Sequence, residues 1–322
     1  MIRFTWLQFR AQAAVAFGAL AVIAIALVAT GPHLAHLYAT TVADCSVHGD
    51  CAAATTAFAS KDRLLQDLGN VLIALPALVG IFWGAPLVAR ELEARTERLV
   101  WAQGVTRSRW VLVKLGFVGL ASAGGAGLLS LMFTWWSSPF DRVNIDRFTS
   151  VFDQRDIVPI GYTVFAFALG VAAGVVIRRT LPAMATTLGV FAAARVGFTQ
   201  WARPHLITPL RVLSPLHLTS GMTYNSVNNG PLTLVGAKPG AWVYSAAVVN
   251  KAGHPVASTF LDHGACLQSR AAPACIGQLR ELLVYQPASR YWAFQWYEMA
   301  IFLGLALVLA GFCFWWVRER LG

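Results

Sequence analysis

Apolar residues occur along this chain in long stretches that few charges interrupt. A helix needs about 20 such residues to cross the hydrocarbon core of a bilayer. Surface helices of soluble domains carry a polar face instead, so a stretch that is apolar on every side favours lipid as its surroundings. The pattern therefore predicts six membrane-spanning helices, at 13–30, 68–88, 111–134, 157–177, 181–200 and 293–317.

The first apolar stretch resembles a secretory signal peptide, because Arg3 and Arg10 precede it. However, no small-x-small cleavage site follows, and Pro32 occupies the region where cleavage would be expected. Phe4 and Trp6 beside the basic residues are typical of a helix that lies in the headgroup layer. We therefore predict an N-terminal interfacial helix followed by an uncleaved first span.

Composition agrees with a membrane protein. The chain has 322 residues, of which 57% are hydrophobic and 12% charged, whereas soluble domains average roughly 45–50% apolar and about 25% charged. The net charge of +10 would suit a nucleic-acid-binding surface. Lys and Arg are densest in the predicted loops on one side, at 1–12, 89–114, 178–180 and 317–322. The positive-inside rule then predicts a multi-pass cell-membrane protein with both termini cytoplasmic and no nucleic-acid partner.

The polar stretch 201–292 is too long for a plain connection. Its part "AWVYSAAVVNKAGHPVASTF" predicts two short strands around Asn250–Gly253, and "CIGQLRELLVY" predicts a short amphipathic helix. The expected fold is thus an all-α integral membrane protein with a small α/β extracytoplasmic domain. Its parts are 1–200 with five spans, the outer domain 201–292, and 293–322 with the sixth span and the C-terminus.

Four of the five cysteines fall in predicted outer segments, where disulfides are stable. They allow three pairings, of which we favour the local one, Cys45–Cys51 and Cys266–Cys275. Free thiols are the alternative.

A charged segment follows the second span. From Val88 to Gln103 there is no Gly or Pro, Gly104 is a plausible helix stop, and Thr106 can cap the next helix. Apolar and charged positions alternate at helical spacing, which predicts a short amphipathic helix at the cytoplasmic surface. Such a helix either anchors a loop or docks on another protein.

Several stretches, in this order, resemble the type-2 ABC exporter permeases, and within them an actinobacterial group. They are "TWLQFRAQ", "ELEARTERLVWAQGVTRSRWVLVKLG", "PIGYTVFAFALGVAAGVVIRRTLPAMATTL" and "YQPASRYWAFQWYEMAIF". The resemblance implies that the charged segment is a coupling helix, seated on an ATP-hydrolysing partner. It implies a permease homodimer with two such partners, which bind ATP and Mg, and no cofactor in this chain. The implied contact residues are Glu91, Glu93, Arg98, Trp101, Gln103 and Arg107.

The chain lacks a phosphate-binding loop of its own. No G-x-x-x-x-G-K-[ST] occurs, and "GGAG" at 124–127 lies in mid-span without a following Lys. We therefore expect a transport subunit that is not an enzyme and that exports an unidentified substrate by alternating access. One alternative is a membrane-embedded enzyme that uses His33, His36, Asp44, His48, His205, His217, His254 and His263, although their spacing fits no zinc motif. Another is a sensor subunit whose outer domain binds a ligand.

Arg195 in the fifth predicted span and Glu298 in the sixth are ionisable residues at membrane depth. A charge at the centre of a membrane helix is unfavourable by about 2.5–3.5 kcal/mol on insertion scales, so each needs a partner or water. At a rise of about 1.5 Å per residue, both lie at similar depths in the outer half of the core. We predict an Arg195–Glu298 ion pair that either locks two helices or gates the outer end of a path.

Overall fold

The computed structural model describes residues 2–40, 62–95, 106–141, 147–148, 151–215, 223–225, 233–235, 240–256 and 279–320. The chain forms two compact units. The first comprises 1–143, 151–206 and 293–322, and the second comprises 144–150 and 207–292. Most of the second unit falls within 201–292, and the location of this stretch outside the membrane stays a prediction.

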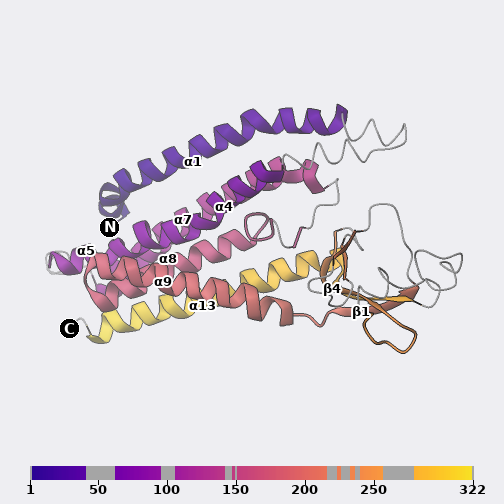
Figure 1. Cartoon of the computed structure of the whole chain (residues 1–322). Coiled ribbons are helices and arrows are strands. Elements are labelled where there is room, and N and C mark those ends of the chain that lie inside the picture. Colours follow the sequence, from indigo (N-terminus) through magenta and orange to yellow (C-terminus); the bar gives the residue numbers. More distant parts are fainter. Residues whose placement is uncertain are drawn as a thin grey trace, which may run out of the picture. The chain divides into compact units, whose positions relative to one another are not determined.

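The first unit is a bundle of helices (Figure 1). Among the described residues, six helical segments are long and apolar enough to cross a membrane, as predicted. The helices are α1 (Ile2–Tyr38), α4 (Asp62–Val79), α5 (Ala85–Glu93), α7 (Arg107–Asp141), α8 (Val158–Ile177), α9 (Thr180–Gly197) and α13 (Tyr291–Arg320). Two π-helical segments, η2 (Gly80–Gly84) and η3 (Phe198–Ala202), and one 3-10 turn, η4 (Arg203–His205), also belong to it, whereas the 3-10 turn η5 (Ala288–Arg290) belongs to the second unit.

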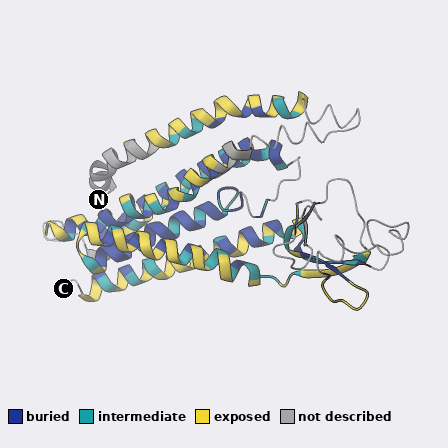
Figure 2. Ribbon diagram, viewed as in Figure 1, coloured by how far each residue is buried: buried dark blue, intermediate teal, exposed yellow. Residues whose placement is uncertain are grey.

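Helix α8 lies at the centre of this bundle, in contact with α4, η2, α5, α7 and α9, and is mostly buried (Figure 2). Glycines allow its close approach to η2. A Cβ on Gly170 would lie 2.3 Å from the carbonyl oxygen of Gly80, and one on Gly84 would lie 2.5 Å from that of Phe167. Backbone contact at this distance excludes any side chain, so the small residues of both helices set their packing.

Helix α1 packs along α7 (Figure 1). It runs unbroken from Ile2 to Tyr38, so the predicted interfacial helix is not a separate element but the first turns of the first span. The reason is local, because no Gly or Pro precedes Gly18 to interrupt the helix. The position of these turns at the membrane surface stays a prediction.

The second unit contains a five-stranded antiparallel sheet with the order β1-β5-β4-β3-β2. The strands are β1 (Leu210–Pro215), β2 (Thr223–Asn225), β3 (Thr233–Val235), β4 (Trp242–Val249) and β5 (Arg280–Gln286). The predicted turn at Asn250–Gly253 is present, closed by a 2.9 Å hydrogen bond from the Gly253 N–H to the Asn250 carbonyl. After it, the described residues 254–256 of the expected second strand form a bridge between Val249 and Pro255, and 257–260 lie outside the described residues.

The amphipathic helix predicted in "CIGQLRELLVY" is wrong, because 280–286 form strand β5. Most of these residues are good helix formers, but β5 pairs with β1 on one side and with β4 on the other. It also buries Leu283 and Tyr285 at alternate positions. Pairing with distant strands outweighs the local preference. Among the described residues of this unit only one helical turn, η5, is present, so the expected α/β domain is a sheet there.

Candidate functional site

Two groups of polar side chains lie in the first unit, one at each end of the bundle. The first surrounds the end of α5, where the charged segment begins. Helix α5 stops at Glu93, and Arg95 follows with a left-handed φ of 55°. The unbroken helix predicted from Val88 to Gln103 is therefore wrong at this point. Tertiary contacts explain the early end of the helix, because two other helices, α7 and α9, hold the last turn of α5.

Glu91 holds α5 against α7. Its Oε1 atom lies 2.6 Å from the Nζ of Lys114, and both side chains are buried. The Lys114 ammonium also donates to the Leu87 carbonyl at 3.2 Å and lies 4.7 Å from the centre of the Trp110 ring. A buried ammonium is tolerated only when it is paired and hydrogen-bonded, and Lys114 is both.

Glu93 holds α5 against α9. Its Oε2 atom accepts two hydrogen bonds from Thr180, from the backbone N–H at 3.0 Å and from the hydroxyl at 2.8 Å. Thr180 is the first residue of α9, and the carboxylate of Glu93 satisfies its N–H. An anion at a helix N-terminus is also favoured by the helix dipole.

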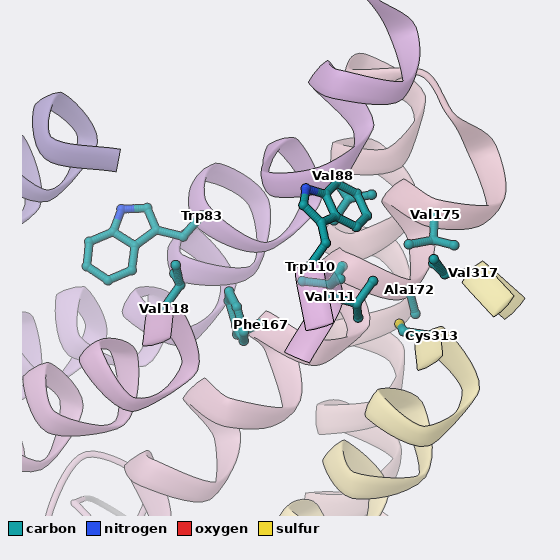
Figure 3. Close-up of a cluster of buried hydrophobic side chains, with 11 residues drawn as sticks. Trp83, Val88, Trp110, Val111, Val118, Phe167, Ala172, Val175, Cys313 and Val317 are labelled. Atoms are coloured by element: carbon teal, nitrogen blue, oxygen red, sulfur yellow. The ribbon is translucent and has the colours of Figure 1, made fainter. Parts of the chain in front are cut away.

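A hydrophobic cluster supports this end of the bundle. Trp110 and Val88 belong to it together with Val175, Cys313 and Val317, so that α5, α7, α8 and α13 share one core (Figure 3). Trp110 is fully buried. The last turn of α5 is therefore fixed to its neighbours by packing as well as by the two carboxylates.

The other expected contact residues are described only in part. Arg98, Trp101 and Gln103 lie outside the described residues, and Arg107 is the first residue of α7. The predicted cap of α7 is present, because the Thr106 hydroxyl accepts from the Arg109 N–H at 3.4 Å. All four cysteines of the predicted disulfides also lie outside the described residues.

The second site is a buried charged cluster, which we define as Asp153, Tyr162, Arg195, Arg203 and Glu298. Arg203 binds Glu298 through two atom pairs, Nη2–Oε1 at 2.8 Å and Nε–Oε2 at 2.9 Å. Arg203 also pairs with Asp153, which in turn lies 2.9 Å from the Nη2 of Arg195. The Tyr162 hydroxyl donates to Glu298 and accepts from Arg203 at 3.0 Å.

The predicted Arg195–Glu298 pair is replaced by this larger arrangement. Both residues lie in the cluster, but Arg195 pairs with Asp153 and Glu298 with Arg203. The missed partner Arg203 was assigned to the outer domain because the fifth span was expected to end at 200. Instead η3 and η4 continue the helix to His205 and bring Arg203 into the bundle. The sequence signal that could have found this partner is an Arg only three residues after the predicted end of the fifth span.

The charges in the cluster balance, with two guanidinium groups and two carboxylates. Burial would raise the pKa of the Asp153 carboxyl, but Arg203 and Arg195 beside it reverse this, and its pKa lies below the ordinary value. The cluster joins the α7–α8 connection to α8, α9 and α13. Gln295 adds to this joint, because its Oε1 accepts from the N–H groups of Ile157 and Val158 at the start of α8, at 3.2 and 3.0 Å.

Among the described residues, six helical segments are long and apolar enough to cross a membrane, which defines the class as a multi-pass membrane protein. The model of the ABC-2 membrane transporter related family matches residues 17–203, more than half of the chain, and the chain belongs to that family. It is thus an ABC-2 type membrane permease subunit, as the sequence resemblance implied; its placement in the actinobacterial group stays a prediction. No curated protein and no solved structure matches the chain significantly.

Proposed function

We propose that this chain is the permease subunit of an ABC exporter, which moves its substrate by alternating access. A separate subunit binds ATP and Mg²⁺ and hydrolyses ATP. The family supports an ATP-binding partner. The absence of a phosphate-binding loop from the sequence supports ATP hydrolysis by that partner and not by this chain. We further propose two permease copies, two ATP-binding subunits and cytoplasmic termini.

The observation that carries the proposal is the attachment of the charged segment. Glu91 ties the last turn of α5 to α7, and Glu93 ties it to the first turn of α9. A partner that pushes on the residues after Glu93 would therefore act on three membrane helices at once. Rigid connections of this kind are what a transporter needs to convert the motion of a soluble subunit into helix movement.

Reconstitution tests this proposal. The full chain is co-expressed with the ATP-binding subunit encoded beside it, purified through a tag on the permease and placed in proteoliposomes. We expect the ATP-binding subunit to co-purify and its ATP hydrolysis to depend on the permease. Export is tested with inside-out vesicles, where ATP should drive substrate inward.

Two results would contradict the proposal in different ways. Failure of any ATP-binding subunit to co-purify would remove the ABC transporter itself. Assembly and permease-dependent hydrolysis without substrate movement would instead favour the sensor subunit. Of the residues considered for a metal enzyme, Asp44, His48, His217 and His263 lie outside the described residues. Among the described residues no three His, Cys, Asp or Glu side chains gather as metal ligands would.

A further inference from the structure

A cavity of about 550 Å³ lies within the first unit, between α1, α4, α7 and α8. Cavities of roughly 300–1,000 Å³ are the usual size for small-molecule sites. Its walls are mainly apolar side chains, among them Ile23 of α1, Leu75 of α4 and Leu129 of α7. From Leu72 to Trp83 its lining extends over about 16 Å of helix, at a rise of about 1.5 Å per residue. The cavity is therefore long, apolar and at membrane depth.

One end of the cavity carries a positive charge. Arg90 lines it, is exposed, and has no ion pair among the described residues. The Arg90 side chain belongs to the helix end where the span meets the charged segment. An arginine in this position favours an anionic group, because its guanidinium offers several hydrogen-bond donors to carboxylate or phosphate oxygens.

The opposite end contains an unsatisfied acceptor. Gln154 is 6% exposed, and its amide oxygen has no hydrogen-bond partner among the described residues. The amide lies close to α4, with Nε2 3.4 Å from where a Cβ on Gly69 would be. The hydroxyls nearby already donate to backbone carbonyls, Ser130 to Asp156 and Thr163 to Pro159, each at 2.7 Å. A buried acceptor without a donor is unfavourable, so this end requires a donor that the described residues do not supply.

We propose that this cavity binds an anionic single-chain amphiphile, with its hydrocarbon chain along α4 and α7 and its charged head at Arg90. The apolar walls take the chain, and a water bound beside its far end donates to the Gln154 amide oxygen. The same chemistry is offered by one acyl chain of a membrane phospholipid and by a free fatty acid. The site uses Arg90 and Gln154, whose side chains make none of the contacts described for the attachment of α5 or for the charged cluster, and its occupancy does not depend on transport.

Photo-crosslinking tests the proposal on the full chain in lipid nanodiscs. Two long-chain fatty acids are used, one with a diazirine next to the carboxylate and one with a diazirine at the far end of the chain. The first should label peptides near Trp83 and Ala121, and the second should label peptides near Leu72 and Ser130. Labelling with the opposite polarity, or labelling spread over all exposed spans, would overturn the proposal.

Variants separate the cavity from the general lipid surface. Ala126 lines the cavity, whereas Leu128 on the same helix is 64% exposed, so Ala126→Phe should abolish labelling and Leu128→Phe should leave it unchanged. Arg90→Gln should weaken labelling by the fatty acid roughly tenfold, as expected for loss of charge-assisted hydrogen bonds, but not labelling by its methyl ester. Arg318→Gln, at an exposed arginine of α13, is the matched control. Equal labelling of Ala126→Phe and Leu128→Phe would contradict a cavity site.

Native mass spectrometry then identifies the source. A phospholipid that survives detergent washing in the parent protein and is lost in Ala126→Phe would assign the bilayer as the source. Binding of added fatty acid to washed protein, without any retained phospholipid, would assign the free amphiphile. Labelling that appears only when copies of the chain are dissociated would show that a second copy fills the cavity, and would refute the proposal. None of these readouts requires ATP, so they succeed or fail independently of the proposed exporter function.

Discussion

At the scale of single residues, the charged cluster places charged side chains where little water reaches them. Glu298 is fully buried and Arg203 nearly so, and each is held by more than one partner. Burial of charges is compensated only while every partner is present. Substitutions in this cluster therefore give the sharpest tests of the structure.

The first prediction concerns the partner of Glu298. Glu298→Gln leaves the shape of the side chain but leaves the charge of Arg203 under-compensated, and should lower the free energy of unfolding by about 3–5 kcal/mol, as for other broken buried pairs. Exchanging Arg203 and Glu298 should restore part of this loss. Exchanging Arg195 and Glu298 should not, because they do not pair directly. Thermal unfolding in detergent measures all three.

The same variant distinguishes a cluster that only holds the helices together from one that gates a path. If the cluster only holds the helices together, transport should fall in proportion to stability. Normal folding of Glu298→Gln with loss of transport would instead show that the cluster gates the outer end of the path. If both exchanges restore stability equally, the pairing described above is wrong.

A second prediction uses pH. The pKa of Asp153 is lower in the folded protein than its ordinary value, which is about 4 in an unfolded chain. The ionised carboxylate therefore adds stability above about pH 4, and this contribution is lost as the pH falls through the folded-state pKa. Asp153→Asn should unfold more easily than the parent at pH 7, with the difference shrinking in acid. Asp67→Asn, at an exposed carboxylate of α4, is the control, and a similar pH profile for it would contradict the assignment.

At the scale of elements, the packing of α8 against η2 is decided by glycine. Gly170→Ala would place its methyl group 2.3 Å from the Gly80 carbonyl oxygen and 2.7 Å from the Ala85 nitrogen. Because these are backbone atoms, the two helices must separate. We expect a loss of at least about 2 kcal/mol, as for other overpacked sites. Gly189→Ala on α9 meets nothing within 4 Å and should stabilise its helix by up to about 1 kcal/mol. Equal thermal shifts in the two variants would refute this packing.

The junction of α5 and α9 supplies a second test at this scale. Glu93→Ala removes the carboxylate that accepts from the first turn of α9, and because this contact is exposed, the variant should unfold only slightly more easily than the parent. Under the proposed function its effect on transport should be larger, because the charged segment is then no longer tied to α9. We expect the ATP-binding subunit still to co-purify while hydrolysis and transport become uncoupled. Unchanged coupling in both Glu93→Ala and the charge reversals Glu93→Lys and Arg98→Glu would favour a simple loop anchor.

At the scale of the whole molecule, the division into two units separates the membrane helices from an antiparallel sheet with its own hydrophobic cluster. The predicted local disulfides, Cys45–Cys51 and Cys266–Cys275, would each stabilise their loops by roughly 2–4 kcal/mol, chiefly by restricting the unfolded chain. Peptide mapping without reduction decides the pairing. A Cys45–Cys266 link would contradict it, and free thiols at all four positions would contradict the outer location of these segments.

Hydrophobic pattern alone was enough for the six spans, since about 20 apolar residues have few stable surroundings other than a bilayer. Local signals for helix caps and turns were also enough, as at the Thr106 cap and the turn at Asn250–Gly253. Tertiary contacts decided the rest. The segment 280–286 is a strand because two other strands pair with it. Glu298 binds Arg203 because two irregular helical segments extend the fifth span. Partners distant in sequence are chosen by the packing of whole elements, and no local pattern records that choice.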